Sequence, residues 1–265
     1  MPVAETLATR VFYEDRGTGP ALLLVHGHPF DHTMWQPQID RFSRTHRVIA
    51  PDLRGYGDTP LGAMTESTDL GEFAEDLVEL LDELGVEQCV LAGLSMGGQI
   101  AMELYRRHPR RVRGLVLADT FPAAETEEGK RIRNAMADRL LRDGMRGYAD
   151  EVLDRMVAPY NTHAAPHVHR MMCATDPVAA AAALRGRAER PDYRETLAAA
   201  TVPALVVVGR DDTYTPVADA EDLHALLPDS TLVVVERAAH LPNLERPEEF
   251  DAALDAFLRS LLRPS

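Results

Sequence analysis

Short, unbroken runs of apolar residues recur along the chain, and most are followed by a segment with helical periodicity. Continuous apolar runs, unlike alternating ones, are typical of strands covered on both faces, as in a parallel sheet. Leucines at helical spacing predict helices over 68–84 and 246–262, and helix formers fill 96–107. Strands that alternate with helices predict an α/β fold with a mostly parallel, doubly wound sheet. The predicted strands cover residues 21–27, 47–53, 88–94, 112–120, 204–209 and 231–236.

One segment, from about Pro122 to Ala200, breaks this alternation. It contains no strand pattern, is rich in Ala, Arg and Met, and is divided by Pro and Gly into four or five short helices. Because strands precede and follow it, we predict a helical cap (122–200) inserted into an α/β core formed by 1–121 and 201–265. A separate helical domain on a linker is the alternative. It is disfavoured because the strands that resume after residue 200 complete the sheet.

Composition narrows the choice of partners. Apolar residues make up 45% of the chain, and 28 basic residues against 42 acidic ones leave a formal net charge of −14. Such a field repels phosphate backbones and acidic membrane surfaces, so we expect no nucleic acid and no membrane as partner. The two cysteines are too few for a disulfide framework. The first residues lack an apolar signal region, and no window reaches membrane-span length, which predicts a soluble, cytoplasmic protein.

The most informative local pattern is Gly93-Leu94-Ser95-Met96-Gly97, which lies between a predicted buried strand and a predicted helix. A sharp strand-to-helix turn would strain the serine backbone and raise its hydroxyl above the sheet edge. Gly93 and Gly97 would then have to be small to avoid a collision at the bend. The helix N-terminus would also direct free amides at an anion formed there. The alternative is an ordinary N-cap serine between loop glycines.

A serine nucleophile needs a base, which is itself oriented by a carboxylate. On a strand-to-helix turn of this kind the acid and then the base follow the serine in chain order. Asp211 and Asp212 follow the strand 204–209, and His240 lies just beyond the strand 231–236. Both positions are at carboxyl ends of strands, where open α/β sheets bind ligands. We favour Asp212 over Asp211, which is better suited to a turn or a surface contact.

The oxyanion of acyl transfer needs two backbone amides. Met96, directly after Ser95, is placed to supply one of them. The second is predicted at His28, in the loop after the first long apolar run, where Gly27 lets the backbone approach closely. His26 and His28 also suggest a metal site, but no third ligand follows at metal-binding spacing, so we expect no metal.

Several motifs together resemble the α/β-hydrolase superfamily, and within it the small esterases and enol-lactonases. This resemblance implies Ser95 as nucleophile, Asp212 as acid, His240 as base, and the amides of His28 and Met96 as oxyanion hole. It also implies that cap helices roof the substrate pocket. The motifs are HGHP (26–29), DLRGYGDT (52–59), GLSMGG (93–98), GRDDTYTP (209–216) and AAHLPNLERPEEF (238–250).

The resulting hypothesis is a carboxylic-ester hydrolase that acts on a small ester or lactone and needs no metal or organic cofactor. A cofactor-free perhydrolase of the haloperoxidase kind and a C–C bond hydrolase on the same triad remain alternatives. A ligand-binding receptor with this fold is disfavoured by the complete set of triad residues. These sequence motifs do not predict the oligomeric state. Candidate pocket residues, for each of which core packing is the alternative, are Trp35, Met136, Met145, Tyr148, Met171 and Met172.

Overall fold

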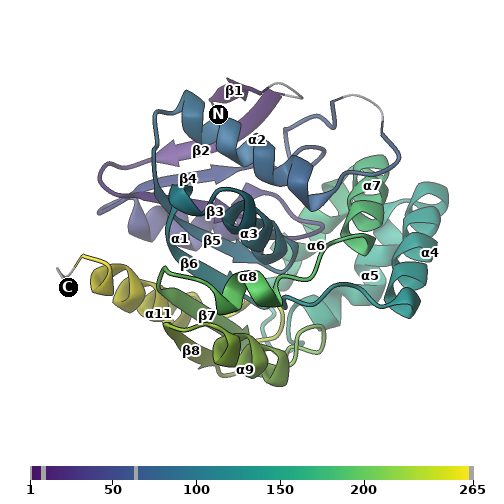
Figure 1. Ribbon diagram of the computed structural model, residues 1–265. Coiled ribbons are helices and arrows are strands. Elements are labelled where there is room, and N and C mark those ends of the chain that lie inside the picture. Colours follow the sequence, from purple (N-terminus) through teal and green to yellow (C-terminus); the bar gives the residue numbers. More distant parts are fainter. Residues whose placement is uncertain (1, 7–9, 63–64, 263–265) are drawn as a thin grey trace.

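The computed structural model describes residues 2–6, 10–62 and 65–262, and its centre is an eight-stranded sheet (Figure 1). The strand order across the sheet is β1-β2-β4-β3-β5-β6-β7-β8. β1 pairs antiparallel with β2 and β2 antiparallel with β4, whereas all pairs from β4 to β8 are parallel. The strands are β1 (Val3–Glu5), β2 (Arg10–Arg16), β3 (Ala21–Val25), β4 (Arg47–Pro51), β5 (Cys89–Leu94), β6 (Val112–Ala118), β7 (Ala204–Gly209) and β8 (Ser230–Val235).

The six strands expected from the apolar runs are β3 to β8, and the predicted α/β class is confirmed. The first two strands, β1 and β2, were not predicted. β2 has the sequence RVFYEDR, in which Val11 and Tyr13 are buried while the residues around them are exposed or half-buried. A strand that covers the core with one face only carries few apolar residues, so β2 lacks the continuous run that marks the central strands.

Helices cover both faces of the sheet because successive strand residues point to opposite sides. Leu23 and Val25 of β3 face one apolar core, and Leu22 and Leu24 face the other. The first core is covered by α2 (Leu70–Glu83), α3 (Met96–Arg107), α8 (Arg194–Ala198) and α9 (Val217–Leu226). The second is covered by η1 (His32–Trp35), α1 (Gln36–Phe42), α10 (Pro242–Glu245) and α11 (Pro247–Ser260).

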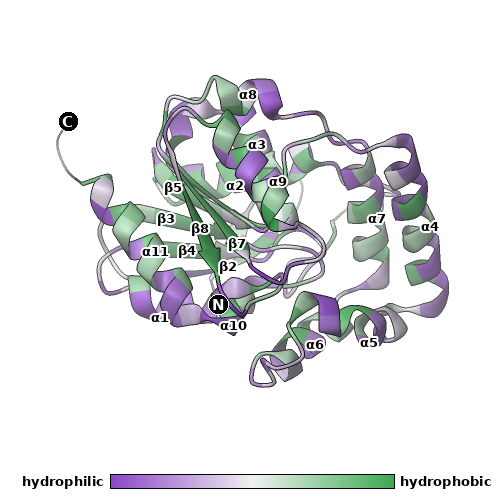
Figure 2. Cartoon of the chain, turned by 90° about the horizontal axis from the view of Figure 1, so that it is seen from below, coloured by the Kyte–Doolittle hydropathy of each residue, from purple (hydrophilic) through white to green (hydrophobic). Residues whose placement is uncertain are grey.

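The chain leaves the sheet after β6, forms four helices beside it, and returns through α8 to β7 (Figures 1 and 2). α4 packs along α7, and their contact surface forms a third, smaller apolar core. α5 packs on α6, and both add side chains to the second core of the sheet. The four helices are α4 (Glu127–Asp143), α5 (Met145–Met156), α6 (Ala165–Ala174) and α7 (Pro177–Ala188). The division into a core and a cap at residues 122 and 200 stays a prediction.

Hydropathy along the ribbon follows this layering: the strands are apolar, and α4 alternates apolar and polar residues (Figure 2). This pattern is that of helices with one buried face. Among the described residues, no helix combines the length and the apolar character needed to cross a bilayer.

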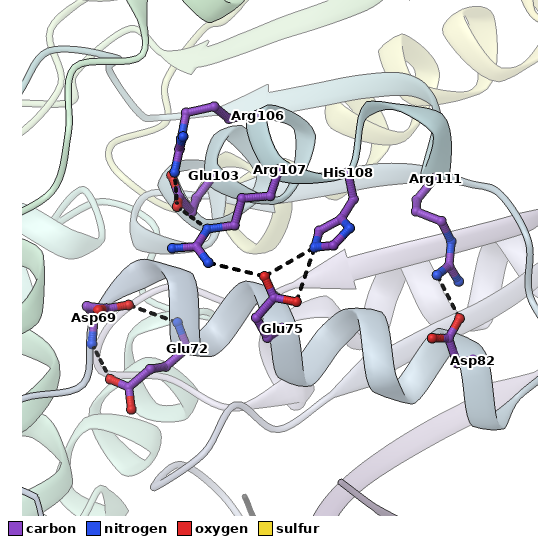
Figure 3. Close-up of polar contacts among 9 residues, drawn as sticks. All are labelled: Asp69, Glu72, Glu75, Asp82, Glu103, Arg106, Arg107, His108 and Arg111. Atoms are coloured by element: carbon purple, nitrogen blue, oxygen red, sulfur yellow. Dashed lines mark hydrogen bonds and ion pairs between the residues drawn. The ribbon is translucent and has the colours of Figure 1, made fainter. Parts of the chain in front are cut away.

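Ion pairs join α2 to the end of α3, the helix that begins directly after Ser95, and to the residues that follow it (Figure 3). The carboxylate of Glu75 on α2 accepts hydrogen bonds from Arg107 (3.2 Å) and His108 (3.1 Å). Asp82 accepts from Arg111 at 2.7 Å. Exposed pairs of this kind contribute only about 0–1 kcal/mol each. The helix is therefore held mainly by the apolar core beneath it, and the ion pairs add orientation.

Candidate active site

Ser95 lies at the turn between β5 and α3 with an unusual backbone conformation, φ 57° and ψ −117°. A positive φ in a non-glycine residue costs on the order of 1–3 kcal/mol and persists only where the surroundings enforce it. Here the N–H of Ser95 donates to the carbonyl of Ala118 (2.9 Å), and its carbonyl accepts from the Thr120 hydroxyl (2.9 Å). These contacts to the end of β6 hold the strained turn in place.

The glycines on either side of Ser95 are required by close backbone contacts. A Cβ atom on Gly93 would lie 2.2 Å from the carbonyl oxygen of Gly97. A Cβ atom on Gly97 would lie 2.2 Å from the carbonyl oxygen of Val25. Both clashes are with backbone, which cannot move aside as a flexible side chain could. The prediction that these two residues must be small is confirmed.

His240 and Asp212 are brought together from the loops that follow β8 and β7. Nδ1 of His240 lies 2.7 Å from Oδ2 of Asp212, and both side chains are buried. The carboxylate also accepts hydrogen bonds from the Tyr214 N–H (2.7 Å) and the Thr215 hydroxyl. Burial alone would raise the pKa of Asp212, but the charge of His240 and these hydrogen bonds lower it. Asp212 therefore holds a negative charge against Nδ1 of His240, which leaves Nε2 as the nitrogen able to take a proton.

The neighbouring Asp211 points elsewhere. Its carboxylate accepts a hydrogen bond from the hydroxyl of Tyr160, in the segment between α5 and α6, and it is exposed. Of the two carboxylates that the sequence offered, Asp212 is the one in contact with the histidine.

Ser95 and His240 line the same cavity, which has a volume of about 120 Å³. No hydrogen bond joins the hydroxyl of Ser95 to His240 among the contacts of the described residues; such bonds are often long until a substrate is bound. The cavity is also lined by Thr215 and Tyr214 from the Asp212 loop, by His28, and by side chains from α4, α5 and α7. The full lining is His28, Ser95, Phe121, Arg133, Tyr148, Met156, Leu184, Arg187, Tyr214, Thr215 and His240.

The two amides expected to form an oxyanion hole are both free to donate. Neither the N–H of His28 nor that of Met96 donates to another group among the described residues. Met96 is the first residue of α3, so its N–H has no intrahelical acceptor. His28 lies in the loop after β3, and its side chain is itself part of the cavity wall. The geometry is compatible with two donors directed at an anion beside Ser95.

The imidazole rings of His26 and His28 have separate partners. The Nε2 atom of His26 accepts from the Leu53 N–H (2.9 Å), and its Nδ1 atom contacts the Gly27 carbonyl (2.9 Å). His28 contacts the Tyr56 hydroxyl through Nδ1 (2.8 Å), and its buried Nε2 atom has no partner. Burial, followed by the charges of nearby arginines, lowers the pKa of His28 well below its usual value. His28 is therefore neutral.

Of the six side chains predicted to line the pocket, one is among the residues that line this cavity. Tyr148 does line the cavity, and Met156 and Leu184, which were not predicted, line it too. The five others pack in or against apolar cores, because helical spacing marks a buried face without showing which cavity it meets. Trp35 packs on Phe250; Met171 and Met172 join the second core of the sheet; Met136 and Met145 lie at the contact between α4 and α7.

Three buried charged residues near the cavity were missed in the sequence. Asp119 follows β6, with one carboxylate oxygen accepting from the Gly209 N–H (2.9 Å) and the other buried without a partner. Glu245 accepts from the N–H groups of Ala239 (2.9 Å) and Leu241 (3.2 Å). Arg187 of α7 lines the cavity. Asp119 had a usable signal, since it lies at the carboxyl end of a predicted strand (112–120), as Asp212 lies close to the carboxyl end of its own strand; Glu245 and Arg187 had none.

Comparison with known proteins places this geometry in a family. A model described as the alpha/beta hydrolase family matches residues 22–253. The 3-oxoadipate enol-lactonase 1 of Acinetobacter baylyi is 29% identical over 91% of this chain and 90% of that enzyme. The pimeloyl-[acyl-carrier protein] methyl ester esterase of Aliivibrio salmonicida is 30% identical over 96% of this chain and 97% of that enzyme.

A solved structure agrees with these relatives. That of a thermophilic esterase from Thermogutta terrifontis superposes with a TM-score of 0.93 at 35% sequence identity, covering 96% of this chain and 95% of the esterase. The similar proteins are thus esterases and an enol-lactonase, which supports hydrolysis of an ester or a lactone as the class of reaction. Fold, motifs and family model agree, and the chain belongs to the alpha/beta hydrolase family.

Proposed function

We propose that the protein is a serine hydrolase that cleaves a small carboxylic ester or lactone through an acyl-enzyme. The observation that carries the proposal is the convergence of Ser95, on its strained turn, with the His240–Asp212 pair on one small cavity. Relatives that are named as an enol-lactonase and a methyl ester esterase support the same class of bond.

In the proposed mechanism, Nε2 of His240 takes the proton of the Ser95 hydroxyl as its oxygen attacks the carbonyl carbon. The tetrahedral oxyanion accepts hydrogen bonds from the amides of His28 and Met96. Collapse expels the alcohol, which receives the proton from His240. Water, deprotonated by His240, then attacks the acyl-enzyme and releases the acid and Ser95. Every group in this sequence is a protein group or water.

Asp212 contributes by its charge and its hydrogen bond. It orients the imidazole and stabilises the imidazolium that forms in each transition state. Because the cavity is small and lined in part by side chains of α4, α5 and α7, these electrostatic interactions are stronger than they would be in open solvent.

The test is hydrolysis of a short-chain chromogenic ester by Ser95→Ala. Loss of a triad nucleophile lowers kcat by on the order of a million-fold, so the variant should fall to the background rate with an unchanged melting temperature. Ser43→Ala, at the end of α1 and outside the cavity, is the matched control and should keep full activity. Mass spectrometry should find a fluorophosphonate adduct on Ser95 of the wild type. Near-normal hydrolysis by folded Ser95→Ala protein would falsify the mechanism.

A further inference from the structure

Arg187 is a buried cation with no anionic partner. It belongs to α7, is 8% exposed and lines the cavity that contains Ser95 and His240. Its Nε–H donates to Oε1 of Gln99 (2.8 Å), a neutral amide. Among the described residues, no carboxylate lies within ion-pair distance of its guanidinium group. Among the described residues, no protein acceptor is found for its two terminal nitrogens, in a side chain that lines the cavity.

The surroundings of Arg187 do not neutralise it. Arg133 and Arg190 are close enough for their charges to act on it, and both of them pair with one carboxylate, that of Glu125. Burial would raise the pKa of Glu125, but these two arginines lower it to about 2. Its carboxylate is therefore ionised and already forms ion pairs with both of them. The local count is three guanidinium groups and one carboxylate, and no acidic residue lines the cavity.

An unpaired charge in a buried position is costly. Burial, then the charges of Arg133 and Arg190, lower the pKa of Arg187, yet a guanidinium group stays protonated in proteins near neutral pH. A purely structural side chain in this position would be more stable as an apolar residue. The arrangement is stabilised when an anion enters the cavity and accepts the free N–H groups, in the planar two-bond geometry that suits a carboxylate.

The position of Arg187 also limits the length of the ligand. Its partner Gln99 lies one helical turn after Ser95, and the N–H of Gln99 donates to the Ser95 carbonyl (3.2 Å). Ser95 itself lies just before the helix, so the Gln99 side chain begins about one helical turn (about 5.4 Å along the axis) from the nucleophile. The guanidinium group lies one hydrogen bond beyond the Gln99 amide. An acyl chain of a few carbon atoms spans that interval, and the cavity volume of about 120 Å³ suits a ligand of that size.

We propose that Arg187 binds a free carboxylate on the substrate, so that the preferred substrates are short esters or lactones of dicarboxylic acids with the second carboxylate unesterified. This inference rests on the proposed function and names the substrate class of the same site. The formal net charge of −14 does not oppose it, since exposed charges more than a Debye length (about 8–10 Å) from the cavity are screened by salt. The three arginines set the field inside it.

The first experiment compares two esters that differ in one group: methyl hydrogen glutarate and its neutral amide, methyl 4-carbamoylbutanoate. A hydrogen-bonded charge pair is worth about a 10- to 100-fold difference, so the wild type should show that preference for the carboxylate ester in kcat/KM. The Arg187→Met variant should lose the preference, mainly through a higher KM for the carboxylate ester. Arg185→Met, on the same helix but paired with Asp138 outside the cavity, should keep it.

The second experiment needs no turnover. Glutarate should raise the melting temperature of Ser95→Ala protein, glutaramide should not, and the double variant Ser95→Ala/Arg187→Met should not respond to glutarate. A wild-type preference ratio near one overturns the inference without the folding of any variant being involved. In that outcome, Ser95-dependent hydrolysis of the neutral ester would leave the proposed function intact. Hydrolysis that survives Ser95→Ala would instead remove the proposed function, while the binding experiment would still test Arg187.

Discussion

The carboxyl group of Asp119 lies beside that of Asp212, at the ends of the neighbouring strands β6 and β7. An oxygen of Asp119, an oxygen of Asp212 and a ring nitrogen of His240 all lie within 4.8 Å of one another. Burial, and next the charge of Asp212, raise the pKa of Asp119 well above its usual range, whereas the pKa of Asp212 is lowered. One carboxyl group of the pair thus retains a proton, and Asp119, without a positive partner, is the one that does so.

We predict that Asp119→Asn keeps most of the activity, because a side-chain amide can accept from the Gly209 N–H as the acid does and is uncharged beside Asp212. The pKa of Asp119 is higher in the folded protein than in the unfolded chain (about 3.9), so the folded protein binds this proton more tightly. The group therefore lowers the free energy of unfolding as pH rises from the unfolded pKa to the folded pKa. The melting temperature of Asp119→Asn minus that of the wild type should therefore increase as pH rises from about 4. A loss of activity comparable to that of Asp212→Asn would show instead that Asp119 acts as an anion.

The two adjacent aspartates of the β7 loop should differ sharply on substitution. Asp212→Asn puts an amide against Nδ1 of His240, favours the wrong tautomer, and should lower kcat by about ten-thousand-fold, as in a known triad. Asp211→Asn removes only an exposed contact with Tyr160 and should leave kcat nearly unchanged. Steady-state kinetics of the two variants side by side make the comparison. The reverse ranking would mean that the acid has been assigned to the wrong residue.

Glu245 should act as a positioning residue for His240. Its carboxylate accepts from the N–H groups on both sides of the histidine, at Ala239 and Leu241, and from that of Ala158 between α5 and α6 (2.8 Å). Glu245→Ala would leave these buried donors unsatisfied, at about 1–3 kcal/mol each, and free the loop to move.

We therefore expect Glu245→Ala to lower both the free energy of unfolding and kcat, with KM changing less. A residue that only stabilises the fold would lower the melting temperature while kcat, measured well below it, stayed normal. Glu249→Ala, on α11 and paired with the exposed Arg246, is the matched control. It should change the free energy of unfolding by no more than about 0.5 kcal/mol and leave kcat unchanged.

Gly97→Ala should disrupt the nucleophile turn, since its Cβ would meet the Val25 carbonyl oxygen at 2.2 Å and the His26 carbonyl oxygen at 2.6 Å. Relief requires α3 to move away from β3, which displaces Ser95, so activity should fall by a larger factor than stability alone accounts for. Gly147→Ala on α5 meets nothing within 4 Å and should stabilise the protein by about 0.4–1 kcal/mol. Denaturant unfolding and ester hydrolysis of both variants test the contrast; equal behaviour would contradict it.

Local patterns in the sequence determined the central strands, the turn at Ser95, and the chain order of the serine, acid and histidine. Each separate signal depends on residues within a few positions of one another: an apolar run, two glycines around a serine, a carboxylate at a strand end. The carboxyl ends of parallel strands meet at one sheet edge by topology, so Asp212 and His240 could be expected near Ser95 without knowledge of packing.

Only the tertiary structure decided which side chains of α4 to α7 reach the cavity and which charges there are paired. Met145, Met156 and Met171 all lie at helical spacing, and the spacing alone cannot tell a helix contact from a cavity wall. Arg187 is one of many arginines in the sequence, and only the structure shows that, unlike Arg133 and Arg190, it pairs with no carboxylate of the described residues. Electrostatic balance at a buried site is a property of elements far apart in the chain, because burial and partners, not residue type, set the cost of a charge.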